Sequence, residues 1–261
     1  MNDYIEILVH SVNRLYGDIS DGPEKPGNWQ LIEELGILNL FLPEDLGGMD
    51  GGWQEASVIL RLSGYHAIPL PVGETMIARK MAHEAGIEIP SGPLNLNDFV
   101  TGDMLMKYGA YLRTCQISGA ILACLEKTVE YTRDRKQFGR QLSKFQAIQH
   151  QLALLTEEAA AVASASAAAA VALDRSDGNF EVSCAKLRAN QAAGLVAGIS
   201  HQLHGAIGIT KEFGLYHHTQ RLWAWRAEFG NNRYWAQRIG KHILGHSDNS
   251  AWALITSRGN Q

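Results

Sequence analysis

The chain has 261 residues, of which 46% are hydrophobic and 19% are charged, and its formal net charge is −4. This is the composition of a globular protein with room for one large domain or two modest ones, and its slight acidity without basic clusters argues against nucleic-acid binding. Three widely spaced cysteines (Cys115, Cys124 and Cys184) indicate reduced thiols, and the N-terminus lacks the pattern of a signal peptide, so we expect a cytoplasmic protein.

Residues 1–90 predict a small helical domain. Its first recognisable helix ends at Gly36, in the position where glycine commonly follows a helix. Apolar residues at helical spacing are expected to share one face of that helix: Trp29, Leu31, Ile32 and Leu35. The glycine-rich stretch 42–52 is a turn, and it is followed by two further short helices over 53–66 and 73–86.

Residues 91–103 predict a short linker, and residues 104–247 predict a four-helix-type bundle followed by a tail over 248–261. The expected long helices cover about 105–134, 144–174, 180–204, 212–225 and 233–244. Alanine and glycine are frequent in the middle pair and would let helices approach closely. The alanine-rich stretch 159–173 falls short of a membrane span, so no membrane is expected. No segment alternates as a strand would, and the sequence therefore predicts an all-α fold.

The stretch 131–146, "YTRDRKQFGRQLSKFQ", contains a helix break rich in basic residues. From spacing alone it is best explained as a helix end, with Gly139 after the last turn and with Arg135 and Arg140 as solvated charges. Arginine beside a helix break is also suited to phosphate, because its planar fork binds two oxygens at once.

A second stretch, "HQLHGAIGITKEFG" at 201–214, contains a turn of small residues that lets a ligand approach the backbone. Several histidines lie in or near it: His201, His204, His217 and His218. No cysteine or carboxylate completes a metal-binding set with them, so we expect no metal.

Three segments, taken in order, resemble motifs of the flavin-dependent acyl-CoA dehydrogenase family. They are "WQLIEELGILNLFLPEDLGGMDGG", "YTRDRKQFGRQLSKFQAIQHQLA" and "HQLHGAIGITKEFGLYHHTQRL". The resemblance implies the helical N-terminal unit and C-terminal bundle of that family, and FAD as the cofactor. It implies that Arg135 holds the FAD pyrophosphate and Phe138 packs near the cofactor. It further implies that the ADP portion is contacted by Gln146, Gln202, Gly205 and Ala206.

The resemblance also implies a reaction and an assembly. An acyl-CoA substrate loses its α-proton to a carboxylate and its β-hydrogen as hydride to the flavin, while hydrogen bonds polarise the thioester carbonyl. In this family the cofactor lies across a subunit interface, which implies a homo- or hetero-oligomer, a dimer or a tetramer.

The sequence departs from the family in three places. The β-sheet domain that normally covers the flavin is almost completely replaced by residues 87–103. An arginine expected near the start of the long helix falls at Ala110, and Arg113 would point from a different face. In ungapped register Phe229 stands where the family has its catalytic glutamate, and Glu228 is one residue away, which is about 100° on a helix.

Glu228 is therefore a candidate catalytic base, with a structural or interface carboxylate as the alternative. Three functions remain open from the sequence. The chain could be an acyl-CoA dehydrogenase active by itself, a companion subunit that completes a longer dehydrogenase, or a helical scaffold that has lost catalysis.

Overall fold

The computed structural model describes residues 3–20, 27–210 and 213–245, and the predicted tail over 248–261 lies outside these ranges. The all-α prediction is confirmed, because the described strands are only two residues long. The helices are α1 Asp3–Ser20, α2 Asn28–Glu34, α3 Trp53–Tyr65, α4 Val72–Glu84, α5 Gly102–Asp134, α6 Gln146–Arg175, α7 Asn179–His204, α8 Leu215–Trp225 and α9 Asn232–Gly245, and the strands are β1 Lys136–Gln137 and β2 Arg140–Gln141.

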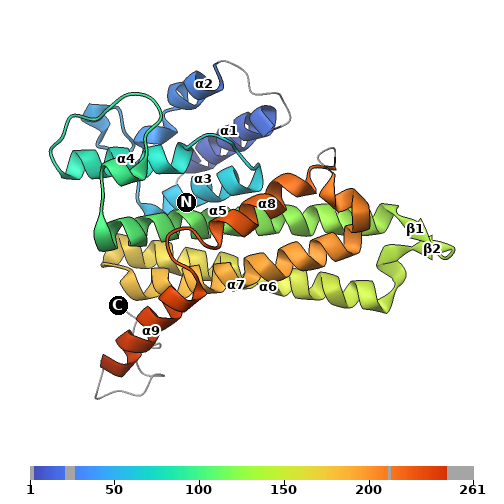
Figure 1. Ribbon diagram of the computed structural model, residues 1–261. Coiled ribbons are helices and arrows are strands. Elements are labelled where there is room, and N and C mark those ends of the chain that lie inside the picture. Colours follow the sequence, from blue (N-terminus) through green and yellow to red (C-terminus); the bar gives the residue numbers. More distant parts are fainter. Residues whose placement is uncertain (1–2, 21–26, 211–212, 246–261) are drawn as a thin grey trace.

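The long helices α5, α6 and α7 form the body of the molecule, and α8 lies along α5 and α7 (Figure 1). Their shared core is lined by small and β-branched residues such as Ala193 and Val196, which are completely buried. Small side chains allow helices to approach closely. The predicted bounds of these helices are within three residues of those observed, which confirms the helical pattern of the C-terminal half.

The N-terminal helices pack directly onto this bundle, above it in Figure 1. Helices α3 and α5 cross at Gly64 and Gly119, where an added Cβ would lie 2.0 Å from the carbonyl oxygen of Gln116 and 1.9 Å from that of Arg61. Only glycine permits so close a crossing. One continuous core contains buried residues from both halves of the chain, so the two halves are packed together.

Helix α1 was not predicted, although its sequence carries the signal. Leu8, Val12, Tyr16 and Ile19 are buried and recur every three or four residues, as one face of a helix requires. In α2 the predicted shared face is wrong for Leu31, which is 48% exposed while Ile32 is buried. Positions one residue apart on a helix differ by about 100°, so the two cannot both face the core.

An acidic side chain from the bundle caps an N-terminal helix. Asp174, near the end of α6, accepts hydrogen bonds from the backbone N–H groups of Trp53 at 2.6 Å and Gln54 at 3.2 Å, the first two residues of α3. These N–H groups have no partner within their own helix. The cap therefore ties the start of α3 to the far end of α6.

The segment between α4 and α5 contains one short 3₁₀ turn, Leu96–Asp98, and no strand. The described chain therefore lacks a β-domain at this point, as the sequence indicated. The first two residues of α5, Gly102 and Asp103, belong to the predicted linker.

Helix α6 is more apolar than expected. By length and composition alone it could cross a membrane, although the sequence was interpreted as falling short, and only 28% of its most apolar window is buried. Core helices of soluble proteins pass the same test. Alanine counts as apolar in such tests although its side chain is a single methyl group, so this helix is weak grounds for a membrane assignment.

Candidate functional site

The basic stretch at the end of α5 forms a hairpin. Helix α5 ends at Asp134, Arg135 adopts an extended conformation, and β1 pairs with β2 in antiparallel register. The prediction that Gly139 follows the last helical turn is wrong. Gly139 and Phe138 are instead the two central residues of the hairpin, with φ of +77° and +51°. Two-residue hairpin loops favour positive φ at both positions because this matches the twist of the strands.

The structure brings the predicted cofactor-binding residues to one end of the bundle, on the right in Figure 1. The ring of Tyr131, in the last turn of α5, stacks on His204, the last residue of α7, with centroids 4.5 Å apart. This contact sets the hairpin beside the turn that follows α7. All six predicted residues are exposed: Arg135, Phe138, Gln146, Gln202, Gly205 and Ala206.

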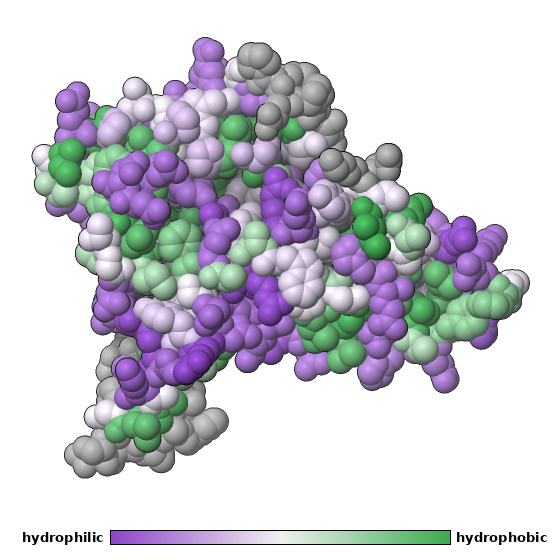
Figure 2. All heavy atoms as spheres, in the orientation of Figure 1, coloured by the Kyte–Doolittle hydropathy of each residue, from purple (hydrophilic) through white to green (hydrophobic). Residues whose placement is uncertain are grey.

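The exposed side chains at this end are cationic, amide and aromatic. Phe138 is 89% exposed, and the Arg140 guanidinium lies 4.0 Å from the centroid of Phe145. Hydrophobic and hydrophilic side chains adjoin on this part of the surface (Figure 2). A guanidinium suits a pyrophosphate, and an exposed ring suits a flat aromatic ligand. The donor set therefore fits a dinucleotide such as FAD, presented on a surface rather than enclosed in a cavity of this chain.

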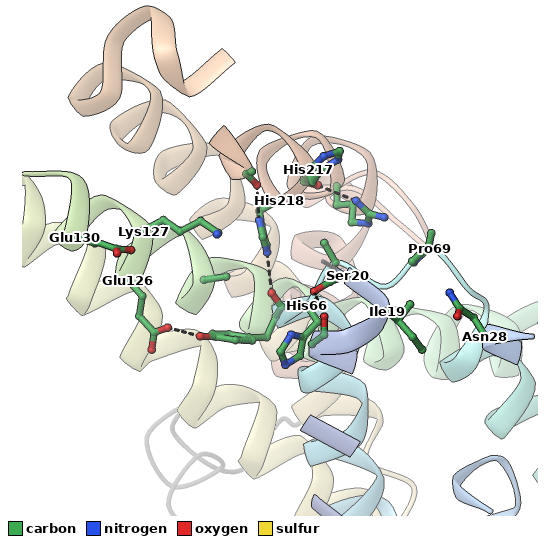
Figure 3. Close-up of a pocket in the computed structure, with 16 residues that line it drawn as sticks. Ile19, Ser20, Asn28, His66, Pro69, Glu126, Lys127, Glu130, His217 and His218 are labelled. Atoms are coloured by element: carbon green, nitrogen blue, oxygen red, sulfur yellow. Dashed lines mark hydrogen bonds between the residues drawn. The ribbon is translucent and has the colours of Figure 1, made fainter. Parts of the chain in front are cut away.

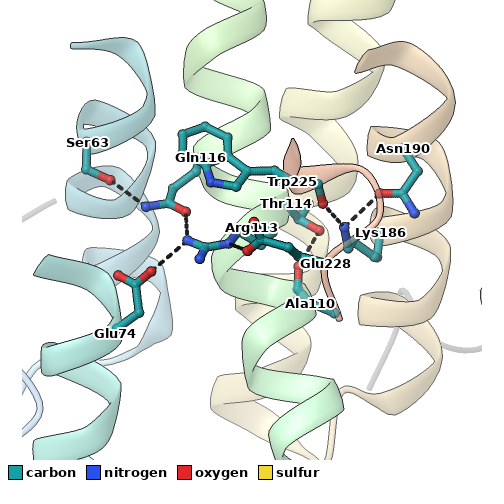
Figure 4. Close-up of polar contacts among 10 residues, drawn as sticks. All are labelled: Ser63, Glu74, Ala110, Arg113, Thr114, Gln116, Lys186, Asn190, Trp225 and Glu228. Carbon is teal, nitrogen blue, oxygen red and sulfur yellow. Dashed lines mark hydrogen bonds and ion pairs between the residues drawn. The ribbon is translucent and has the colours of Figure 1, made fainter. Parts of the chain in front are cut away.

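The second predicted centre is the turn over residues 226–231, which joins α8 to α9. Glu228 lies in this turn and not on a helix, so the predicted 100° rotation away from its neighbour does not apply. One oxygen of its carboxylate accepts a hydrogen bond from Nε of Arg113 at 2.7 Å (Figure 4). Arg113, which was expected to point from a different face of α5 than Ala110, thus points toward this turn. Which of these two neighbouring positions of the helix faces the acyl site stays a prediction.

Arg113 has a second carboxylate partner, from the N-terminal half of the chain. Its Nη1 lies 2.8 Å from Oε1 of Glu74 in the first turn of α4, and it also donates to Gln116 at 2.5 Å. Its guanidinium carbon lies 5.6 Å from the ring centroid of Trp225 and 5.8 Å from that of Phe229. Arg113 therefore joins α4, α5 and the 226–231 turn.

Phe229 fills the space at the start of α5. Its ring packs against Gly109, where an added Cβ would lie 2.3 Å from Cδ1 of the ring. Its φ is +51°, and that of Gly230 is +100°. Its carbonyl oxygen accepts a hydrogen bond from the indole of Trp235 on α9 at 3.0 Å. The residue that the ungapped register predicts to stand opposite the family glutamate is thus an apolar ring with no proton-accepting atom.

Two side chains of helix α7 hold the same turn by hydrogen bonds. Lys186 is completely buried, and its amino group donates to the Trp225 carbonyl and to the side-chain oxygen of Asn190, each at 2.7 Å. Asn190 in turn donates to the Gly230 carbonyl at 3.1 Å. Burial, together with repulsion by Arg113, lowers the pKa of Lys186 to about 7, and attraction by Glu228 opposes that shift. A buried lysine was not predicted, since no sequence pattern distinguishes it from a solvated one.

A cavity of about 500 Å³ lies elsewhere, between the ends of α1 and α3 and the sides of α5 and α8 (Figure 3). Within it, the two ring nitrogens of His218 lie 3.1 Å from the Gly214 carbonyl oxygen and 2.7 Å from that of Tyr65. Burial is the main cause that lowers the pKa of His218 to about 4. The hydroxyl of Tyr65 donates to Glu126. In the described part of the chain, no three His, Cys, Asp or Glu side chains gather as a metal site.

Comparison with known proteins decides the family. The family model described as "Acyl-CoA dehydrogenase, C-terminal domain" matches residues 104–244, which is more than half of the chain. The chain belongs to the acyl-CoA dehydrogenase family. The resemblance inferred from the three motifs is thereby confirmed, and the family's dehydrogenases place the chain in the oxidoreductase class.

Two curated relatives are matched over most of their length. The acyl-CoA dehydrogenase IpdE2 of Mycolicibacterium smegmatis is 25% identical over 249 residues, which covers 72% of this chain and 78% of that protein. IpdE2 of Mycobacterium tuberculosis is 26% identical over 255 residues, covering 74% and 79%. Other dehydrogenases of the family are matched over much less of their length: the bovine short/branched chain specific acyl-CoA dehydrogenase is 35% identical, but over 23% of that protein.

Solved structures share the fold. The Tcur3481-Tcur3483 steroid ACAD variant superposes with a TM-score of 0.83 at 17% identity, over 95% of this chain and 99% of that one. The ChsE4-ChsE5 complex from Mycobacterium tuberculosis superposes with a TM-score of 0.82 at 16% identity, over the same shares. At these identities the likeness establishes the fold of the acyl-CoA dehydrogenase family and no more.

Proposed function

We propose that this chain is one subunit of a heteromeric, FAD-dependent acyl-CoA dehydrogenase, and that a second, β-domain-bearing chain supplies the flavin cover and the catalytic base. The observation that carries the proposal is the state of the 226–231 turn. Phe229, which the ungapped register predicts to stand opposite the family base, packs on Gly109, while the neighbouring Glu228 is paired with Arg113 at 2.7 Å. One oxygen of this carboxylate is therefore already engaged by Arg113 and is not left open to a substrate.

The role proposed for this chain lies at the hairpin end. Arg135 would hold the FAD pyrophosphate, and Phe138 would pack against the cofactor. Gln146 and the Gln202–Ala206 turn would contact its ADP portion. When bound, FAD would accept the β-hydrogen of the acyl group as hydride while a carboxylate takes the α-proton. The six predicted cofactor-binding residues are exposed, which suits a cofactor whose flavin is covered by another chain. The described part of this chain contains no β-domain that could cover it.

Two of the similar structures support a two-chain assembly, since they are described as the Tcur3481-Tcur3483 steroid ACAD and the ChsE4-ChsE5 complex. By the same likeness, a steroid-derived acyl-CoA is the substrate class that we would test first. We infer a cytoplasmic location from the cysteine usage.

A second candidate is a homo-oligomeric dehydrogenase in which Glu228 is the base. One observation favours it: the Glu228 side chain is 40% exposed, so a substrate could reach it. The two candidates differ in what Glu228→Gln does to an assembled, active enzyme. A general base contributes about 10²–10⁴ in rate, and that factor would be lost if Glu228 were the base. Our proposal expects a change of only a few-fold.

The proposal is tested by co-expressing the chain with a β-domain-bearing family member from the same genome and recording visible spectra. We expect the chain alone to be colourless and the complex to show oxidised FAD. Arg135→Ala should weaken FAD binding about 10- to 100-fold, the value of a charge-assisted hydrogen bond of about 1.5–3 kcal/mol. Arg233→Ala, an exposed arginine on α9, is the matched control. An Arg135→Ala complex with unchanged FAD affinity would refute the assigned role.

A further inference from the structure

The hairpin between α5 and α6 and the residues that flank it carry an excess of positive charge. Residues 133–144 contain five cationic side chains and one carboxylate, in a chain whose net charge is −4. Figure 1 shows the hairpin at one end of the molecule, beyond the packed body of the bundle. Among the residues that the structure describes, no carboxylate lies within ion-pair distance of Arg135 or Arg140. Both guanidinium groups are therefore open to an anionic ligand.

The register of the two strands places both arginines on one face of the hairpin. Gln137 of β1 lies opposite Arg140 of β2. The pairing continues to Arg135, whose carbonyl oxygen accepts a hydrogen bond from the Leu142 N–H at 2.9 Å. Side chains alternate between the two faces along a strand, and residues directly opposite each other share a face. Arg135, Gln137 and Arg140 therefore lie on the same face, and Lys136 belongs to the other.

The two arginines are close enough to act on one ligand. They occupy diagonal positions on this face, which are about 7–8 Å apart and within reach of long side chains. Two like charges at this separation repel each other, and an anion bound between them removes that repulsion. Each planar guanidinium fork binds two oxygens of one phosphoryl group. The pair therefore matches a ligand that carries two adjacent phosphoryl groups.

The Arg140 side chain is held by an aromatic ring. Its guanidinium carbon lies 4.0 Å from the ring centroid of Phe145, and the Phe145 ring meets that of Phe138 edge-on, with centroids 6.3 Å apart. A guanidinium stacked on a ring keeps its in-plane N–H groups free to donate. Holding the side chain in one orientation before a ligand arrives lowers the entropic cost of binding. Phe145 therefore prepares Arg140 for an anion.

We propose that Arg135 and Arg140 together clamp a diphosphate, and that Phe145 positions Arg140 for this role. The diphosphate is that of FAD, so the identity of the ligand rests on the proposed function, whereas the clamp itself rests on the geometry of the hairpin. Arg140 is thus a cofactor-binding residue in addition to the six that the family motifs imply. A CoA thioester also carries a diphosphate, and the second test below separates the two sources.

The first test uses the chain alone, labelled with ¹⁵N at arginine, and follows the Nε–H signals by NMR during titration with inorganic pyrophosphate. We expect the Arg135 and Arg140 signals, each assigned by its loss on substitution by methionine, to shift along one binding curve. The signal of Arg233, an exposed arginine on α9, should not follow that curve. Pyrophosphate should bind about 10-fold more tightly than orthophosphate, and Arg140→Met should abolish this preference.

Lys136→Met is the matched control, because it removes one positive charge from the opposite face of the same hairpin. At physiological ionic strength exposed charges are screened over about 8 Å, so we expect this variant to keep the preference for pyrophosphate. Equal losses in Lys136→Met and Arg140→Met would indicate an adventitious ion only and would overturn the clamp. An Arg140 signal that does not respond to pyrophosphate would also overturn it.

The second test measures the FAD affinity of the complex with the β-domain-bearing partner, by flavin absorbance. Arg140→Met should weaken FAD binding about 10-fold and leave the affinity for acyl-CoA unchanged. Phe145→Leu should weaken FAD binding in the wild type, and it should add no further loss in Arg140→Met. A further loss there would show that Phe145 does not act through Arg140 and would overturn its positioning role.

The outcomes separate this inference from the proposed function. An FAD-loaded complex whose FAD affinity is unchanged by Arg140→Met would overturn the inference and leave the proposed function standing. Loss of acyl-CoA affinity instead of FAD affinity would assign the clamp to CoA and overturn its assignment to FAD. A chain that binds pyrophosphate at both arginines but forms no FAD-loaded complex with the partner would contradict the proposed function and leave the clamp standing.

Discussion

Replacing Arg113 by methionine tests how the 226–231 turn is joined to the N-terminal helices. The Arg113 side chain is 12% exposed, and it pairs with Glu74, which is 17% exposed, and with Glu228, which is 40% exposed. Removing one partner of a buried ion pair costs about 3–5 kcal/mol, because the remaining charge stays buried without compensation. Exposed pairs contribute about 0–1 kcal/mol. We therefore expect most of the stability lost in Arg113→Met to come from the broken pair with Glu74.

A double-mutant cycle separates the two contributions. Urea unfolding of Arg113→Met, Glu74→Gln, Glu228→Gln and the two double variants gives the coupling energy of each pair. We expect Arg113→Met to lower the free energy of unfolding by about 3 kcal/mol. The coupling to Glu74 should be about 2 kcal/mol and that to Glu228 about 1 kcal/mol or less, in the order of their burial.

The result that would refute this reasoning is a reversed order. A coupling to Glu228 larger than that to Glu74 would mean that the turn, rather than α4, supplies the buried partner of Arg113. A free energy of unfolding for Arg113→Met within about 0.5 kcal/mol of the wild-type value would mean that the cluster of Arg113, Glu74 and Glu228 is solvated.

Three further changes test other contacts. Asp174→Ala should lower stability by about 1–2 kcal/mol, because the cap at Trp53 is lost, and thermal unfolding will show whether it does. Gly109→Ala should lower stability by about 1–3 kcal/mol by crowding the Phe229 ring. Adding Phe229→Ala to that variant should relieve this loss. If it does not, the strain lies elsewhere. Burial lowers the pKa of Lys186 to about 7, so between pH 7 and about 10 the unfolded chain binds a proton that the folded chain has released. The wild type should therefore gain stability relative to Lys186→Met as pH rises through this range, and parallel curves for the two proteins would contradict the assignment.

Much of the fold follows from the sequence because its helices are long and strongly patterned. The bounds of α5, α6 and α7 lie within three residues of the prediction, since thirty-residue helices carry many turns of pattern. Gly139 was misplaced because a glycine ends helices and closes hairpins with the same positive φ, and spacing alone does not separate the two uses.

The site was predictable in part. The six residues assigned from the family motifs lie together at the hairpin end of the bundle, and their role in binding FAD stays a prediction. The cluster at the turn was not predictable, because Glu74, Arg113 and Lys186 are brought together from three helices far apart in the sequence. The sequence named Arg113, but its contacts with Glu74 and Glu228 could not be predicted, because they depend on how α4 and the 226–231 turn pack against α5. The role of Glu228 stays a prediction.

The central claim is that this chain contributes half of a flavin site that another chain completes. Native mass spectrometry in the presence of FAD, with an acyl-CoA turnover assay on the same samples, tests it most directly. The samples are the purified chain alone and the chain with the proposed β-domain-bearing partner. The account predicts no FAD and no turnover for the chain alone, and an FAD-loaded, active complex with the partner. An FAD-loaded homo-oligomer of this chain that dehydrogenates acyl-CoA by itself would contradict it.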